Sequence, residues 1–203
     1  LSVLGAGSNP LVPHHKMEKL VTRSGAPFTH LRPGFFMQNL STTYRTAIRD
    51  HGEIFVPAGR GRTSFIDIRD IAEAAARVLG KAQHFGRSYT LTGGEALTYH
   101  DVARVLSRVL GRTVRYAAPT PRAFRTQLLA EGLPADYVRV LASIYFVARW
   151  HLAGRITRDT AALLGRAPIS FERFAHDHAH LWQHTSSSTN QRPPVAAPAG
   201  GHS

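Results

Sequence analysis

The sequence predicts an α/β fold, in which part of a parallel sheet is combined with a small and mostly helical lobe. Residues 14–39 and residues 63–110 each alternate between the spacing of a helix and the spacing of a strand. Strands that alternate with helices are typical of parallel sheets, because a parallel connection has to cross over the sheet. From Pro121 onward the pattern is helical almost without interruption. We therefore expect three regions: a sheet-forming part at residues 1–95, a mostly helical lobe at residues 96–184, and a disordered tail at residues 185–203.

The first residues, LSVLGAG, predict a buried strand that runs into a loop. A fold seldom begins directly on a buried strand, and the first residue is Leu1 rather than Met. We therefore expect the sequence to be a fragment, or to be numbered from an internal residue of a longer chain.

Residues 14–39 predict a helix, a turn, a strand and a loop, in that order. Apolar residues recur at helical spacing across residues 17–21, and a Ser-Gly pair at residues 24–25 is a typical helix stop. Residues 28–31 then alternate like a strand, and the pattern breaks at the Arg-Pro-Gly of residues 32–34. Ligands of open α/β sheets bind just beyond the carboxyl ends of strands. The loop that follows this strand is therefore a candidate ligand site.

A helix is expected at residues 40–51, where apolar residues recur at helical spacing before a stop at Gly52. A short strand at residues 53–56, a turn rich in Gly and Pro at residues 57–61 and a strand at residues 63–68 follow. These elements lead away from the candidate ligand loop.

The next helix is expected to begin at Asp70 and to run to Leu79. Asp70 is a suitable N-cap, because Glu73 stands three residues later and completes a capping box. Asp67 and Arg69 join Asp70 in a polar cluster. We interpret this cluster as a capped helix with a surface ion pair rather than as a catalytic group.

Another strand and helix follow, separated by a Gly-Gly turn. The strand is expected in the segment RSYTLT before the glycines, and Thr98 with Asp101 forms a capping-box signature for the helix. Gly111 is a typical helix end, and residues 114–117 predict a short strand.

The helical lobe carries a group of aromatic residues on its longest expected helix, within residues 121–151. Tyr137, Tyr145, Phe146 and Trp150 lie there, and they would either line a pocket or pack a core. We expect Tyr145 to contact a substrate.

Three histidines near the end of the chain, His176, His180 and His184, would share one face of a continuous helix. They could hold a metal ion, but the residues near them offer few carboxylates, so we expect a solvated face and no metal site. Residues 185–203 are mostly Ser, Pro, Ala and Gly and cannot bury enough apolar surface to fold.

Charge and composition exclude several classes of protein. The net charge of +12 comes from basic residues, nearly all arginine, that are spread along the chain without a block, so we expect no nucleic-acid partner. The absence of cysteine excludes disulfides, thiol nucleophiles and thiolate metal sites. No run of about 18 apolar residues and no signal-peptide pattern occur. We therefore expect a cytoplasmic protein without a membrane partner, while the composition leaves the oligomeric state open.

Several segments together resemble one family, the NmrA-like branch of the atypical short-chain dehydrogenases/reductases. They occur in the expected order between Leu1 and Trp182: LSVLGA, the spacing H-x-x-x-E at His14 and Glu18, SGAPFTHLRPGFFMQN, PAGRGRTSFIDIRDIAEAAARVL, YTLTGGEALTYHDVARVLSRVLGR and GRAPISFERFAHDHAHLW. The resemblance implies a Rossmann-like parallel sheet that binds NADP or NAD, with a small C-terminal substrate lobe.

The sequence departs from this family in its first residues. It has no G-x-x-G-x-x-G after a first strand, and therefore no helix N-terminus for the cofactor's pyrophosphate. The triplet Gly5-Ala6-Gly7 lacks the third glycine and the following helix, and we interpret it as a turn. The chain thus resembles a family member that lacks the N-terminal half of its Rossmann domain.

The resemblance also implies roles for single residues. The family's catalytic Lys position falls on His14 and its Tyr position on Pro10, so the usual proton donor is missing. His14 could bind a cofactor ribose or donate a proton, or it could simply begin a helix. Ser2 matches the Ser that orients a carbonyl, although a serine at a strand end also often satisfies backbone groups.

The loop after residue 32 is the strongest candidate for a cofactor contact. Pro33 fixes the backbone and Gly34 permits close approach, so that Pro33, Gly34 and Phe35 could lie flat against a nicotinamide. Phe36 and Asn39 would then face the cofactor or a substrate. The alternative is a packed loop in which Asn39 caps the following helix.

The implied function is hydride transfer from NAD(P)H to a small planar acceptor such as a quinone, which would be the partner of the protein. Such acceptors suit the missing Tyr, because the oxyanion that forms is already stabilised by resonance. A second hypothesis is a regulatory protein that senses NAD(P) without turnover, and a third is a truncated product without activity.

Overall fold

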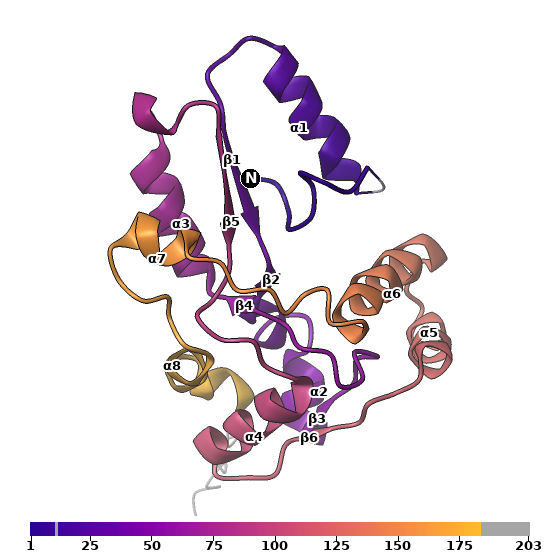
Figure 1. Ribbon diagram of the computed structural model, residues 1–203. Helices are drawn as coiled ribbons and strands as arrows, with labels where there is room; N and C mark the ends of the chain where they lie inside the picture. The colour runs from indigo at the N-terminus through magenta and orange to yellow at the C-terminus, as the bar shows by residue number, and fades with distance from the viewer. Residues whose placement is uncertain (11, 184–203) are drawn as a thin grey trace, which may run out of the picture.

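The computed structural model describes residues 1–10 and 12–183, and it is an α/β fold in which each assigned pair of strands is parallel (Figure 1). The strands are β1 (Thr29–Pro33), β2 (Phe35–Phe36), β3 (Glu53–Ile54), β4 (Phe65–Ile66), β5 (Arg87–Leu91) and β6 (Arg115–Tyr116). The α-helices are α1 (Pro13–Arg23), α2 (Arg45–His51), α3 (Ile68–Val78), α4 (Tyr99–Leu110), α5 (Pro121–Ala130), α6 (Ala135–Arg149), α7 (Asp159–Leu164) and α8 (Phe171–Asp177). Short 3₁₀ turns are η1 (Met37–Leu40), η2 (Ala82–His84) and η3 (Ala179–Trp182). The predicted fold class is confirmed.

The longest strand pair is β1 with β5, whose register runs from Thr29 opposite Arg87 to Pro33 opposite Leu91. The first residues lie along β1, because the Ser2 N–H donates to the Leu31 carbonyl over 2.7 Å and the Leu4 N–H donates to the Pro33 carbonyl over 2.9 Å. These residues follow a strand-like course, as the sequence predicts, although they are not assigned as a strand. In Figure 1, α3 and α7 lie on one side of this pair and α1 lies on the other side, beside its upper half.

The two other strand pairs, β2 with β4 and β3 with β6, are only two residues long each. The predicted strand at residues 63–68 is therefore shorter than expected, although its first residue, Thr63, still forms an antiparallel bridge with Leu97. Because β6 pairs with β3, and α7 packs on α3 and β5, segments beyond residue 95 contribute to the sheet. The boundary at residue 95 stays a prediction.

Two predicted helix starts are wrong. The helix expected from Leu40 begins at Arg45, because residues 37–40 form η1 instead, although it ends at Gly52 as predicted. Helix α3 starts at Ile68, and its N-cap is Asp67 rather than Asp70, because the Asp67 side chain accepts the Arg69 N–H.

Helix α4 agrees with the prediction at both ends. Thr98 accepts the Asp101 N–H, Asp101 accepts the Thr98 N–H, and Gly111 follows the helix in the left-handed conformation.

Aromatic side chains dominate the main core, which lies between the strands, α4, α6 and α8. Its fully buried members include Phe124, Phe171, Phe174 and Trp182, and the Trp182 indole N–H donates to the Leu40 carbonyl over 3.0 Å. Trp182 thereby links η3, near the end of the described residues, to η1, which follows the candidate loop.

Helix α1 differs from the other long helices, because none of its apolar residues is buried. Met17 is 60% exposed and Leu20 is 70% exposed, whereas the buried residue of this helix is the charged Glu18. The helix itself, its end at Ser24 and the left-handed Gly25 agree with the sequence prediction. In the described part of the chain, the apolar face of α1 has no counterpart to bury it.

No helix among the described residues is both long enough and apolar enough to cross a membrane. His184 and the predicted tail at residues 185–203 lie outside the described residues.

The adjacent glycines Gly93 and Gly94 allow a test of this packing. A Cβ on Gly93 would stand 2.0 Å from the Phe65 carbonyl oxygen, whereas a Cβ on Gly94 would meet only Pro168, at 3.9 Å. We expect Gly93→Ala to lower the free energy of unfolding by about 2 kcal/mol or more, because the backbone of β4 would have to shift. Gly94→Ala should stay within about 0.5 kcal/mol of the wild type. Urea unfolding followed by circular dichroism measures both, and equal losses would contradict the packing described.

Candidate functional site

The candidate loop is shorter than predicted, because β1 continues through Pro33 and Phe35–Phe36 form β2, so that only Gly34 lies between the two strands. Pro33 is buried at the end of β1, and the Gly34 N–H donates to the Leu91 carbonyl of β5 over 2.9 Å. A Cβ on Gly34 would lie 3.1 Å from the Ser64 carbonyl oxygen, so the loop passes close to the residue before β4. Phe35 and Phe36 are half-buried. Residues 33–36 therefore form a fixed backbone surface at the carboxyl ends of β1 and β5.

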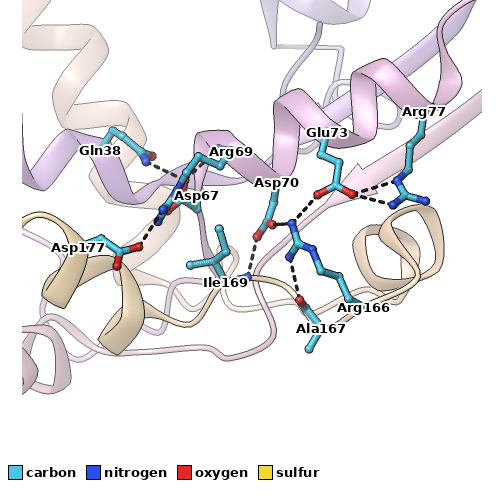
Figure 2. A network of polar contacts seen from close by, with 10 residues as sticks. All are labelled: Gln38, Asp67, Arg69, Asp70, Glu73, Arg77, Arg166, Ala167, Ile169 and Asp177. Atoms are coloured by element: carbon cyan, nitrogen blue, oxygen red, sulfur yellow. Dashed lines mark hydrogen bonds and ion pairs between the residues drawn. The ribbon is translucent and has the colours of Figure 1, made fainter.

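The end of this loop is tied to the start of α3 through Gln38 (Figure 2). The Gln38 amide donates to an Asp67 carboxylate oxygen over 2.9 Å, and its own oxygen accepts the Ile68 N–H over 3.1 Å. Arg69 joins Asp67 to Asp177 of α8, with 2.8 Å in each ion pair. Burial acts to raise the pKa of Asp67, but hydrogen bonds from Arg69 and Gln38 outweigh it, and the net effect lowers that pKa.

Asp70, one turn later on α3, holds the segment between α7 and α8. One of its oxygens pairs with Arg166 over 2.8 Å, and the other accepts the Ile169 N–H over 2.7 Å (Figure 2). Arg166 also pairs with Glu73 over 2.6 Å. The cluster is therefore a capped helix with ion pairs, but the expected surface position is wrong, because Asp67 and Asp70 are both fully buried, and Asp67 is the cap in place of Asp70.

Glu18 of α1 and Arg32 of β1 form a two-pronged ion pair beneath the N-terminal loop. Arg32 donates from Nε over 2.9 Å and from Nη2 over 2.6 Å to the two carboxylate oxygens. The Arg32 hydrogen bond lowers the pKa of Glu18 to about 2, against the effect of burial, and the Ser2 hydroxyl contributes to the same lowering. A Cβ on Gly7 would lie 2.5 Å from Arg32 Nη1, so the turn at residues 4–8 packs directly on this guanidinium.

The structure places the predicted residues His14 and Ser2 near the two ends of this unit. His14 lies in the first turn of α1, half-buried, and its ring makes no hydrogen bond with any described residue. The neighbouring His15 is different, because its Nδ1 donates to the Ala6 carbonyl over 2.7 Å. Ser2 is buried, and its backbone N–H pairs with β1. His14 therefore begins the helix and also keeps both ring nitrogens available for a ligand.

Asn39 and Tyr145, the predicted substrate contacts, differ strongly in exposure. Asn39 is exposed within η1, and the alternative that it caps the next helix is wrong, because α2 has Tyr44 as its N-cap and no side-chain cap.

Tyr145 is 4% exposed, lies in the main core and shares a short hydrogen bond with the Tyr44 hydroxyl. Burial raises the pKa of Tyr145 well above its ordinary range. A substrate contact of Tyr145 stays a prediction, while its packing role is clear.

The expected face of three histidines does not form. Helix α8 ends at Asp177, so that His176 and His180 lie on different elements, and His184 lies outside the described residues. Among the residues that the structure describes, no group of three His or acidic side chains could hold a metal ion.

Sequence reasoning missed the Glu18–Arg32 and Gln38–Asp67 contacts. Both join residues that are distant along the chain, 14 and 29 positions apart. The sequence offers only residue types as a signal for these contacts, because each pair combines a carboxylate with a side chain that can donate a hydrogen bond.

Comparison with known proteins identifies the family. The model of the NmrA-like family matches residues 7–168. The chain belongs to the NmrA-like family. Among its relatives, the NAD(P)H azoreductase of Xenophilus azovorans is 36% identical over 162 residues, which are 80% of this chain and 56% of the azoreductase. The chain therefore spans little more than half of that relative.

Solved structures of NmrA-like and related proteins agree with this assignment. The NADPH-dependent quinone oxidoreductase of Escherichia coli, in complex with NADPH, has a TM-score of 0.78 and 29% identity over 89% of this chain and 64% of its own. NmrA, a negative transcriptional regulator in complex with NAD, has a TM-score of 0.61 and 20% identity over 82% of this chain and 56% of its own. The second likeness shows the fold alone.

The Glu18–Arg32 pair predicts a pH-dependent contribution to stability. Because the pKa of Glu18 falls from 4.5 to about 2, the pair stabilises the folded state above about pH 4.5, and this contribution disappears as the pH falls toward 2. We expect Glu18→Gln to cost about 1–3 kcal/mol near neutral pH and progressively less toward pH 2. Urea unfolding across this pH range measures the difference.

Glu172→Gln is the matched control for this experiment. Its pair with Arg108 is exposed on both sides, so that its loss should change the free energy of unfolding by no more than about 0.5 kcal/mol. A cost for Glu18→Gln that stays constant from pH 7 to pH 2 would argue against an ionised buried pair.

Proposed function

We propose that the protein to which this chain belongs is an oxidoreductase that passes a hydride from NADPH or NADH to a small planar acceptor such as a quinone. The observation that carries this proposal is the fixed backbone surface at residues 33–36, at the carboxyl ends of β1 and β5. The named activities of two relatives, an NAD(P)H azoreductase and an NADPH-dependent quinone oxidoreductase, support the same reaction class.

The described residues fit one half of such a cofactor. Pro33 offers no backbone N–H, and on this proposal a planar ring lies against the backbone of residues 33–36. The space at the Gly34 Cβ position is taken by Ser64, so Gly34 serves to bring this backbone close to β4. By contrast, the sequence has no glycine-rich strand, turn and helix unit that would hold a pyrophosphate. On this proposal, the phosphate-binding part belongs to a segment that the present sequence does not contain, and the protein acts in the cytoplasm.

Each residue of the site then has a physical task. When bound, the reduced nicotinamide supplies the hydride. The loop at residues 33–36 orients the ring, and its fastening to Leu91 and Ser64 keeps that orientation constant. Phe36 and Asn39 face the acceptor from the following turn. His14 holds a cofactor hydroxyl or donates a proton, since its ring has no other hydrogen-bond partner among the described residues.

A quinone suits a site without the usual Tyr. The oxygen that gains negative charge after hydride addition is already conjugated with the ring, so the catalytic site needs no strong general acid. Orientation of the nicotinamide and the quinone, together with weak hydrogen bonds to the quinone oxygen, can supply most of the rate enhancement of hydride transfer. An NAD(P)-sensing protein without turnover is the alternative outcome.

The decisive experiment uses the coding sequence upstream of Leu1 together with this chain. We expect the longer protein to oxidise NADPH or NADH in the presence of quinones. We also expect His14→Ala to lower kcat/KM by about tenfold to hundredfold. His51→Ala, at the exposed end of α2, is the control and should leave the rate unchanged.

Two results would count against the proposal. Tight cofactor binding without turnover of any quinone would favour the sensing hypothesis. Micromolar binding of NADPH by the 203-residue chain alone would contradict the inference that its pyrophosphate site lies elsewhere.

A further inference from the structure

The positive charge of this protein is not neutralised evenly in the fold. Arginines on α3, α4 and α8 pair with acidic residues, as do Arg32 and Arg166. Arg125 of α5 and Arg149 of α6 make no ion pair and no hydrogen bond within the described part of the chain. Their charge is therefore available to a ligand.

Both arginines line the same cavity, which lies between α5 and α6 and has a volume of about 310 Å³. This is near the lower end of the range of about 300–1,000 Å³ for small-molecule sites. The rest of its wall is largely apolar and includes Pro57, Pro121, Ala142 and Phe146. In Figure 1 these two helices stand on the side opposite α3 and α7.

The wall of this cavity is held in place by close backbone contacts. A Cβ on Gly61 would lie 1.8 Å from the Ala148 carbonyl oxygen, so that the loop at residues 57–61 packs directly on the end of α6. A Cβ on Gly59 would lie 3.5 Å from Arg149 Cγ and 3.2 Å from its Nη1. The Arg149 side chain therefore runs across a glycine surface, and this contact limits its conformations.

The geometry points to a binding site for a small aromatic carboxylate in this cavity, a ligand with a planar apolar body and one anionic group. Guanidinium groups bind carboxylates through paired, charge-assisted hydrogen bonds. The Phe146 ring and the two prolines offer surfaces on which an aromatic body can stack. A purely inorganic anion would leave the apolar wall unused, and a neutral aromatic compound would leave both charges unpaired.

This site does not depend on the proposed hydride transfer. None of the cavity residues belongs to the loop at residues 33–36 or to α1. Binding can therefore be measured on the 203-residue chain without NAD(P)H, and failure of the quinone assay would leave the present proposal untouched.

Isothermal titration calorimetry with naphthoate tests the proposal, with neutral naphthamide and inorganic phosphate as comparison probes. We expect naphthoate to bind with one site per chain, and naphthamide and phosphate to bind at least about tenfold more weakly. Arg125→Gln and Arg149→Gln should each weaken naphthoate binding by about tenfold, and Phe146→Ala should weaken naphthoate binding more than phosphate binding.

Arg122→Gln is the matched control, because Arg122 lies on the same helix as Arg125 and is exposed like Arg125 and Arg149, but does not line the cavity. It should leave naphthoate affinity within about twofold of the wild type. Thermal unfolding of each variant verifies that it is folded, and a salt titration of the wild type gives a second measurement that needs no variant. Naphthoate binding should weaken with salt, whereas naphthamide binding should not.

Three results would overturn the proposal. These are no binding of naphthoate, equal binding of naphthoate and naphthamide, or an equal effect of Arg122→Gln and the cavity variants. Phosphate binding as tight as naphthoate binding would overturn the aromatic part of the assignment.

Discussion

Two buried carboxylates at the start of α3 hold together parts of the chain that are far apart in sequence. Asp67 caps the helix and binds Gln38, which ends the candidate loop, while Asp70 binds the segment before α8. A buried carboxylate is costly unless hydrogen bonds and opposite charges compensate it, and both have such partners. Because the partners come from η1, from α3 itself and from the segment between α7 and α8, η1 and this segment can only take positions that satisfy the two acids. The orientation of the candidate loop depends on this constraint.

Sequence motifs predicted the ends of helices correctly where the motif residues interact only with their own helix. The Thr98–Asp101 capping box and the stops at Gly52 and Gly111 lie where expected. Asp70 shows the limit of this reasoning, since it precedes Glu73 at capping-box spacing but is used for a contact with Ile169. The acid three residues earlier takes the cap instead. Sequence spacing identifies residues able to cap, and long-range packing decides which of them does so.

In the candidate site, too, local features could be predicted from the sequence and long-range packing could not. The backbone conformation at Pro33 and Gly34 could be predicted, because proline restricts the backbone locally and glycine permits conformations that other residues avoid. The burial of Tyr145 could not, since helical spacing alone does not say which face of α6 meets the core. For α1 the spacing predicts an apolar face, yet Met17 and Leu20 remain exposed. Burying each would contribute about 1.5–3 kcal/mol, so this face is suited to a covering segment.

Polar side chains that already have hydrogen-bond partners within the protein serve its structure, whereas side chains without such partners are available to ligands. Arg32, Glu18, Asp67 and His15 have partners that fix their positions, so their loss is expected to change folding or geometry before it changes chemistry. His14 is different, because its ring is half-buried and has no hydrogen-bond partner among the described residues. A polar ring that loses part of its hydration without compensation is costly, and a ligand that supplies the missing partner recovers that cost. Arg125 and Arg149 are exposed, so no such cost arises for them, but their shared cavity offers apolar surface to the body of a ligand and positive charge to its anionic end.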